Sequence, residues 1–235
     1  MIVKTFVGTS GWYYDWNKEK TLDWYIENSN LDAVELNASF YRFPFPNMIK
    51  SWARKGKSLH WAIKVNRLIT HQFKFSGKAA ATWKKFYDLF SPMHEFIDYF
   101  LFQLPPSFTP KGKSLIEKFF GKIKTAKKCA LELRHELWFK EDLIKWVKSL
   151  GITWVSIDAP EFTRDIVKTT KNVYLRIHGR ADWYRHNYTD RELRNIGKRI
   201  IAVQPDKVYI FFNNNHNMLK NARKMKMIAE KLEGK

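Results

Sequence analysis

Short apolar runs alternate with longer amphipathic segments along almost the whole chain. Each run is five or six residues long, and most are rich in β-branched and aromatic residues, as is typical of strands buried in a parallel sheet. We predict eight such strands, at residues 3–8, 33–37, 61–65, 99–104, 130–134, 153–158, 173–178 and 208–213.

The segments between these runs repeat apolar residues at intervals of three and four, which predicts helices with one buried face. Trp83, Phe86 and Phe90 follow this spacing, and Thr189 with Glu192 has the capping-box spacing that begins a helix. Residues 159–171 lack the pattern, so we expect the sixth crossover helix to be reduced or missing. Eight strand–helix units in a single domain spanning residues 1–235 predict an α/β fold, the (β/α)8 TIM barrel.

A doubly wound open sheet is the alternative fold for this order of elements. Such sheets usually carry a glycine-rich nucleotide loop directly after the first strand. Residues 8–11 read GTSG, which fits neither the GxGxxG pattern nor the P-loop. The barrel is therefore favoured.

Polar residues interrupt the apolar runs mainly at their carboxyl ends. Where two occur in one run they are two positions apart, so their side chains share one face of the strand. These residues are Glu35, Asn37, Lys64, Asn66, Gln103, Glu132, Arg134, Ser156, Asp158, Arg176, His178 and Asn213. The carboxyl ends of TIM-barrel strands surround the active site, so we expect these side chains to gather at the barrel mouth.

Three acids, three cations and one imidazole make up the charged part of this set, which predicts a nearly balanced mouth. The candidate general acids and bases are Glu35, Glu132, Asp158 and His178. The candidate clamps for a phosphate or carboxylate are Lys64, Arg134 and Arg176. With no evident cofactor, this set favours hydrolase or lyase chemistry if the protein is an enzyme.

Amide, imidazole and aromatic side chains near the strand ends are further candidates for substrate binding. They are Asn37, Tyr41, His71, Gln103, Trp183, Tyr184 and Asn213. Aromatic rings interleaved with arginines after the seventh strand can stack on bases or sugars while the arginines meet phosphates. Alternatively, these rings only cover the end of the barrel.

Two other interpretations of the charged set stay open. One is a closed network of ion pairs that fills the barrel without binding a ligand. The other is a divalent metal held by the acids and His178, with His71 and His135 as additional ligands. Three cations in the same ring oppose a metal, and the sequence contains no HExxH or similar ligand spacing.

The chain is strongly basic, with 42 Lys and Arg against 23 Asp and Glu and a formal net charge of +19. This excess favours an anionic small molecule or a nucleic acid as partner, so a non-catalytic nucleic-acid-binding barrel is the second functional hypothesis. A single cysteine, Cys129, excludes a disulfide framework and a cysteine metal cluster. Neither a signal peptide nor a membrane-spanning segment is evident, so we expect a cytoplasmic protein without a membrane partner.

Seven segments of the chain together resemble the YecE-like family. They are GTSGW at 8–12, VELNASFYRFP at 34–44, KVNRLITH at 64–71, LFQLPPSF at 101–108, LELRHELWF at 131–139, LRIHGRADWY at 175–184 and FFNNN at 211–215. The resemblance implies a TIM-barrel fold and brings no established reaction. The family's recurrent residues fall on Glu35, Asn37, Tyr41, Lys64, His71, Gln103, Glu132, Arg134, Arg176, His178 and Asn213, nearly the set chosen by strand alternation.

Overall fold

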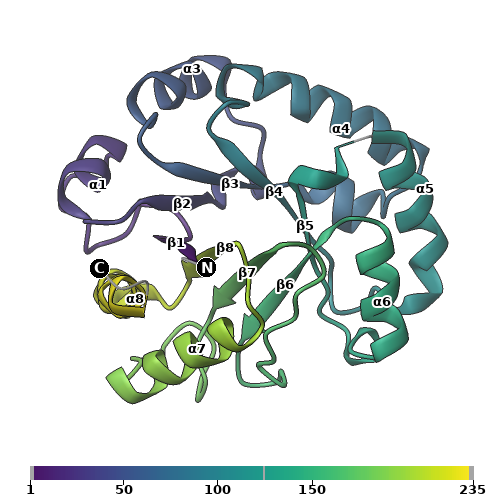
Figure 1. The fold of residues 1–235 in the computed structure, drawn as a ribbon. Coiled ribbons are helices and arrows are strands. Elements are labelled where there is room, and N and C mark those ends of the chain that lie inside the picture. The colour runs from purple at the N-terminus through teal and green to yellow at the C-terminus, as the bar shows by residue number, and fades with distance from the viewer. Residues whose placement is uncertain (1–2, 124, 233–235) are drawn as a thin grey trace.

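Eight parallel strands close into a barrel in the computed structural model, which describes residues 3–123 and 125–232 (Figure 1). The strands are β1 (Lys4–Thr9), β2 (Ala33–Leu36), β3 (His60–Lys64), β4 (Ile97–Gln103), β5 (Cys129–Glu132), β6 (Thr153–Asp158), β7 (Asn172–Ile177) and β8 (Lys207–Phe212). Each strand pairs with its neighbours in sequence, and β8 pairs with β1 from Lys207 opposite Lys4 to Phe212 opposite Thr9. The predicted TIM barrel is confirmed, and each predicted strand end lies within two residues of the observed one.

Helices connect the strands and surround the barrel (Figure 1). They are α1 (Leu22–Asn28), α2 (Ala38–Tyr41), α3 (Pro46–Lys55), α4 (Gly77–Leu89), α5 (Lys113–Ile123), α6 (Glu141–Ser149), α7 (Asp190–Ala202) and α8 (Met218–Leu232), with short turns η1 (Leu68–Gln72), η2 (Ser91–Met93), η3 (Pro110–Gly112), η4 (Ala126–Lys128), η5 (Glu136–Trp138) and η6 (Asn215–Asn217). The predicted capping box begins α7, with Thr189 and Glu192 bonded to each other's backbone N–H. Among the described residues, no helix is both long and apolar enough to cross a bilayer.

The connection from β6 to β7 runs through residues 159–171, all of which are described and none of which is helical. The prediction of a missing sixth crossover helix is therefore confirmed. Side-chain hydroxyls bond this connection to β6: Ser156 Oγ accepts from Val167 N–H at 2.9 Å, and Thr169 Oγ1 accepts from Trp154 N–H at 2.8 Å. The two bonds satisfy the backbone N–H groups of Val167 and Trp154 and attach the connection to β6.

Apolar side chains fill the lower part of the barrel interior. This cluster consists of Ala33, Ala62, Tyr99, Leu101, Ala130, Val155, Tyr174, Tyr209 and Phe211. The polar residues Glu35, Lys64, Glu132 and Arg176 each follow a member of the cluster by two positions and therefore point the same way, one layer higher. The polar layer at the mouth is therefore packed directly on this apolar cluster.

Strand β6 is the exception to the predicted alternation. Val155 belongs to the interior cluster, so Ser156 and Asp158 face away from the barrel axis. The prediction that they line the interior is wrong because Val155 and Ile157 occupy the inner face at this end of β6, which leaves Ser156 and Asp158 on the outer face. The outer face tolerates Ser156 because the connection after β6 supplies a hydrogen-bond donor, Val167 N–H, to its hydroxyl.

Candidate functional site

A cavity of ≈ 600 Å³ opens at the carboxyl ends of the strands. Its lining residues come from strand ends and from the segments that follow them: Tyr14, Asn37, Phe40, Tyr41, Lys64, Arg67, His71, Gln72, Gln103, Arg134, Arg176, Tyr184, Asn213 and Asn215. Nine of these are predicted binding residues, and six of the nine are residues that strand alternation selected. A smaller hollow of ≈ 190 Å³ adjoins the cavity, shares Tyr14, Asn37 and Tyr41 with it, and adds the rings of Trp12 and Tyr13.

Arg176 on β7 joins two buried carboxylates beneath this cavity. Its Nη2 lies 2.7 Å from Glu35 Oε1, and its Nη1 lies 2.6 Å from Glu132 Oε2. The side chains of all three residues are fully buried. The other oxygen of Glu132, Oε1, accepts from Arg134 Nε at 2.5 Å. One carboxylate therefore orients two guanidinium groups toward the cavity.

The Glu35 carboxylate is occupied by two further donors. Ser10 Oγ donates to Oε1 at 2.8 Å, and Tyr174 Oη donates to Oε2 at 2.7 Å. Neither Glu35 nor Glu132 lines the cavity. Burial raises the pKa of Glu132, but Arg134 and Arg176 lower it by more, so its pKa lies well below the usual range for glutamate. Both carboxylates are therefore better suited to positioning the arginines than to exchanging protons with a substrate. Glu132 holds Arg134 and Arg176, and Glu35 holds Arg176.

Lys64 at the end of β3 is held differently from the arginines. Its Nζ lies 4.2 Å from the centroid of the Phe40 ring. Burial lowers the pKa of Lys64 to about 7, and the positive charge of Arg176 acts in the same direction. The amine is therefore partly unprotonated at neutral pH, in a side chain that lines the cavity.

Two histidines lie at the mouth in their neutral form. Burial and the Lys64 charge lower the pKa of His71 to about 4. Burial and Arg176 hold the pKa of His178 well below its usual value. His178 Nδ1 accepts from Asn213 Nδ2 at 3.3 Å, while its Nε2 is buried without a hydrogen-bond partner among the described residues. His71 lines the cavity, whereas His178 lies just below it.

The charges on the cavity wall are all positive. Lys64, Arg67, Arg134 and Arg176 line the cavity, and no Asp or Glu is among its lining residues. This corrects the expectation of a balanced mouth, for two reasons. Arg67 joins the lining from the segment after β3, and the carboxylates of Glu35 and Glu132 are turned inward and neutralised. The cavity therefore suits an anionic ligand.

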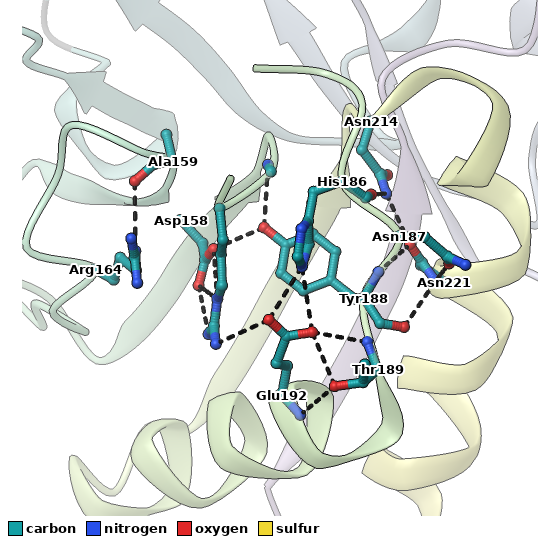
Figure 2. Close-up of polar contacts among 12 residues, drawn as sticks. Asp158, Ala159, Arg164, His186, Asn187, Tyr188, Thr189, Glu192, Asn214 and Asn221 are labelled. Carbon is teal, nitrogen blue, oxygen red and sulfur yellow. Dashed lines mark hydrogen bonds and ion pairs between the residues drawn. The ribbon is translucent and has the colours of Figure 1, made fainter. Parts of the chain in front are cut away.

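Asp158 does not join the cluster with Glu35, Glu132 and His178 that the sequence predicted. Its carboxylate accepts from Arg180 Nη2 at 2.8 Å and from Tyr188 Oη at 2.6 Å (Figure 2). This follows from the reversed facing of β6, which turns Asp158 toward the loop after β7.

That loop carries Trp183 and Tyr184 to the rim of the mouth. Its first turn is fixed by Gly179 N–H, which donates to Tyr188 Oη at 3.1 Å, and Gly179 has φ +122°, where a side chain is strained. Trp183 lies over Arg134, with the guanidinium carbon 5.3 Å from the ring centroid. The Asp158 network thus positions aromatic residues of the mouth without lining the cavity itself.

We expect Tyr188→Phe to lower the free energy of unfolding by about 1–3 kcal/mol, because Asp158 loses a buried donor and Gly179 N–H loses its acceptor. Chemical denaturation measures the change. Tyr184→Phe is the matched control, since its hydroxyl forms no hydrogen bond with any described residue, and we expect a change within about 0.5 kcal/mol. Equal losses in the two variants would contradict the role given to the network.

Several residues of the site escaped the sequence analysis. Tyr14, Phe40, Arg67, Gln72 and Asn215 lie on segments after strands, where no alternation marks the inward side. Tyr174 had a usable signal, because it precedes Arg176 by two positions on the same strand face. Tyrosine fits an apolar strand pattern, so the pattern alone does not show that the Tyr174 hydroxyl donates to Glu35.

The predicted metal alternative finds no assembled ligand set in the part of the chain that the structure describes. No three His, Cys, Asp or Glu side chains there lie close enough together to hold a metal ion. His135, one of the suggested additional ligands, caps η5 by accepting from Leu137 N–H at 3.2 Å.

Comparisons with known proteins extend over almost the whole chain. Residues 6–235 match the family model described as "Protein of unknown function DUF72". A DUF72 family protein from Thermotoga maritima MSB8 superposes with a TM-score of 0.83 at 24% identity, covering 97% of this chain and 99% of that one. Another from Enterococcus faecalis V583 has a TM-score of 0.83 at 19% identity, covering 96% and 95%.

More distant structures share the barrel alone. The 3-keto-L-gulonate-6-phosphate decarboxylase of Vibrio cholerae O1 superposes with a TM-score of 0.56 at 9% identity, covering 97% of this chain and 99% of that one. No curated protein matches the chain in sequence.

Proposed function

Because the chain belongs to the DUF72 family, which is described as a family of unknown function, we propose its function from the chemistry of the barrel mouth. We propose an enzyme that binds an anionic, phosphate-bearing substrate in the cationic cavity, with a nucleotide or nucleic acid as the favoured class. Acid–base chemistry of the hydrolase or lyase type follows there. The observation that carries the proposal is the four cations on the cavity wall.

Two of these cations are held in place by one carboxylate. Arg134 and Arg176 are held by the same Glu132 carboxylate, at 2.5 Å and 2.6 Å, so their guanidinium groups are fixed side by side before a ligand arrives. A preorganised pair loses little side-chain entropy on binding. Arg176 Nε is also buried without a hydrogen-bond partner among the described residues, so this guanidinium keeps one unused donor.

The favoured substrate class rests on the hollow beside the cavity. Trp12, Tyr13, Tyr14 and Tyr41 supply aromatic rings there, and Tyr13 and Tyr41 are 73% and 68% exposed. Exposed aromatic rings next to a cationic cavity suit a planar base or a sugar attached to a phosphate.

The groups best placed to exchange protons are Lys64 and His71. Both line the cavity, and their pKa values of about 7 and about 4 leave each partly or wholly unprotonated at neutral pH. Glu35, Glu132 and His178 support this wall from below, so their roles in catalysis stay predictions.

We expect Arg134→Gln to weaken binding of adenosine monophosphate at least tenfold, because it removes a charged donor from the cavity wall. Isothermal titration measures the change, with adenosine, which lacks the phosphate, as the reference ligand. Arg185→Gln removes the same charge from a side chain that is 81% exposed and outside the cavity. We expect this control to bind like the parent.

Equal weakening in the two variants would contradict the proposal and favour the second candidate, a surface that binds nucleic acid through its net charge of +19. Binding of that kind falls steeply with salt and is insensitive to any single cavity residue. The two candidates are therefore separated by the same pair of variants, measured with a single-stranded oligonucleotide at two salt concentrations.

A further inference from the structure

Lys64 has no polar partner although it is surrounded by charged groups. Its Nζ forms no hydrogen bond or ion pair with any residue that the structure describes. It instead makes a cation–π contact with the Phe40 ring, whose centroid is 4.2 Å away. Its side chain lines the cavity although the residue is only 9% exposed. The amine therefore packs against an apolar ring on one side and faces the cavity, where a ligand can bind, on the other.

The two nearby carboxylates are unavailable to Lys64. Both Glu35 oxygens and both Glu132 oxygens already accept from other side chains, at distances of 2.5–2.8 Å. The strand end that carries Lys64 is also fixed, because its carbonyl oxygen accepts from Ser39 Oγ at 2.7 Å. Position and lack of pairing are thus built into the fold.

The surrounding charges keep this amine partly unprotonated. Burial lowers the pKa of Lys64 to about 7. Arg176 on β7 and Arg134, two residues after β5, act in the same direction, and the opposing effect of Glu132 and Glu35 is weaker than that of burial. His71, in η1 on the same wall, is neutral at pH 7 because its pKa is lowered to about 4. An unprotonated lysine amine is a nucleophile toward carbonyl carbon.

We propose that Lys64 forms an imine with an aldehyde or ketone carbonyl of the anionic substrate, while the cations of the cavity wall hold the substrate's charged group. The nitrogen lone pair attacks the carbonyl carbon and a C–N bond forms. The C–O bond then breaks, and the oxygen leaves as water with the two protons of the amine. This inference rests on the proposed function, narrowing the substrate to one that carries both a carbonyl and an anionic group.

Borohydride trapping tests the inference. Glycolaldehyde phosphate and glycolaldehyde are matched probes that differ only in the phosphate, and sodium borohydride reduces an imine to a stable secondary amine. We expect peptide mass mapping to find the phosphorylated adduct on Lys64, formed at least tenfold faster than with glycolaldehyde and slowed by inorganic phosphate. The labelling rate at Lys64 should rise with pH around pH 7.

Two internal references make the result specific. Lys84, whose side chain is 79% exposed, reports the reactivity of an ordinary lysine, and it should label more slowly than Lys64 at pH 7. Lys64→Met removes the nucleophile and fills similar space, so a folded variant without the adduct confirms the assignment.

Adducts on exposed lysines such as Lys84, with none preferred at Lys64, would overturn the inference. If adenosine monophosphate still bound the cavity in that case, the proposed function would survive. Equal labelling of Lys64 by the two probes would show that the imine does not require an anionic substrate. If inorganic phosphate also failed to bind the protein, the proposed function would be overturned as well.

Discussion

Replacing Arg176 by methionine is expected to lower the free energy of unfolding by about 3–5 kcal/mol at neutral pH. The guanidinium is fully buried and pairs with Glu35 and Glu132, which are also fully buried. Methionine fills much of the same space but leaves two ionised carboxylates with less compensation inside the barrel. Urea denaturation followed by circular dichroism measures the loss.

Arg134→Met is the matched control for this variant. Arg134 pairs with Glu132 alone among these carboxylates and is 14% exposed, so water compensates part of its removal and a smaller loss is expected. Adding Glu35→Gln and Glu132→Gln to Arg176→Met removes the uncompensated charges and should recover much of the stability. If Arg176→Met cost no more than Arg134→Met, the central ion pairs would not support the fold.

The barrel and most of its mouth follow from the alternation of the strands. Glu35, Glu132 and Arg176 stand two residues after positions that pack inside the barrel, and side chains two apart on a strand share a face. Since the carboxyl ends of all strands meet at one end of a TIM barrel, the residues had to converge there. The order of the elements and the two-residue period of a strand are sufficient to predict this convergence.

Strand β6 shows where the same argument fails. A strand buried on both faces is apolar on both, so its polar residues mark the inner face only if a helix makes the outer face apolar. No helix follows β6 in the chain, and Ser156 and Asp158 bond to the loops after β6 and β7 instead. The absence of a helix after β6 is visible in the sequence, whereas the outward facing of Asp158 is visible only in the structure.

Pairing within the mouth lay beyond sequence reasoning for a different reason. Which cation meets which carboxylate depends on side-chain lengths and directions across strands that are far apart in the chain. Glu35 and Arg176 are 141 positions apart, yet they form the ion pair that turns one carboxylate away from the cavity. The positive wall, and the unpaired state of Lys64, are consequences of that pairing.

Lys64→Met is expected to raise the free energy of unfolding by about 1–3 kcal/mol at pH 7. The folded protein lowers the pKa of Lys64 from its ordinary value of 10.5 to about 7, because burial penalises the charged amine. Folding therefore works against a protonated group, and methionine removes this cost. Denaturation of the parent and the variant at a series of pH values measures the difference.

The pH dependence gives this prediction its sign. Between about pH 7 and pH 10.5 the unfolded chain holds a proton on Lys64 that the folded chain has released, so this group makes the parent more stable as the pH rises. The advantage of Lys64→Met should therefore be largest near and below pH 7 and disappear toward pH 10.5. Lys84→Met, on an exposed side chain, should show no such trend. A constant difference at all pH values would mean that Lys64 titrates normally, whereas the expected trend would identify a lysine whose charged form is destabilised by burial.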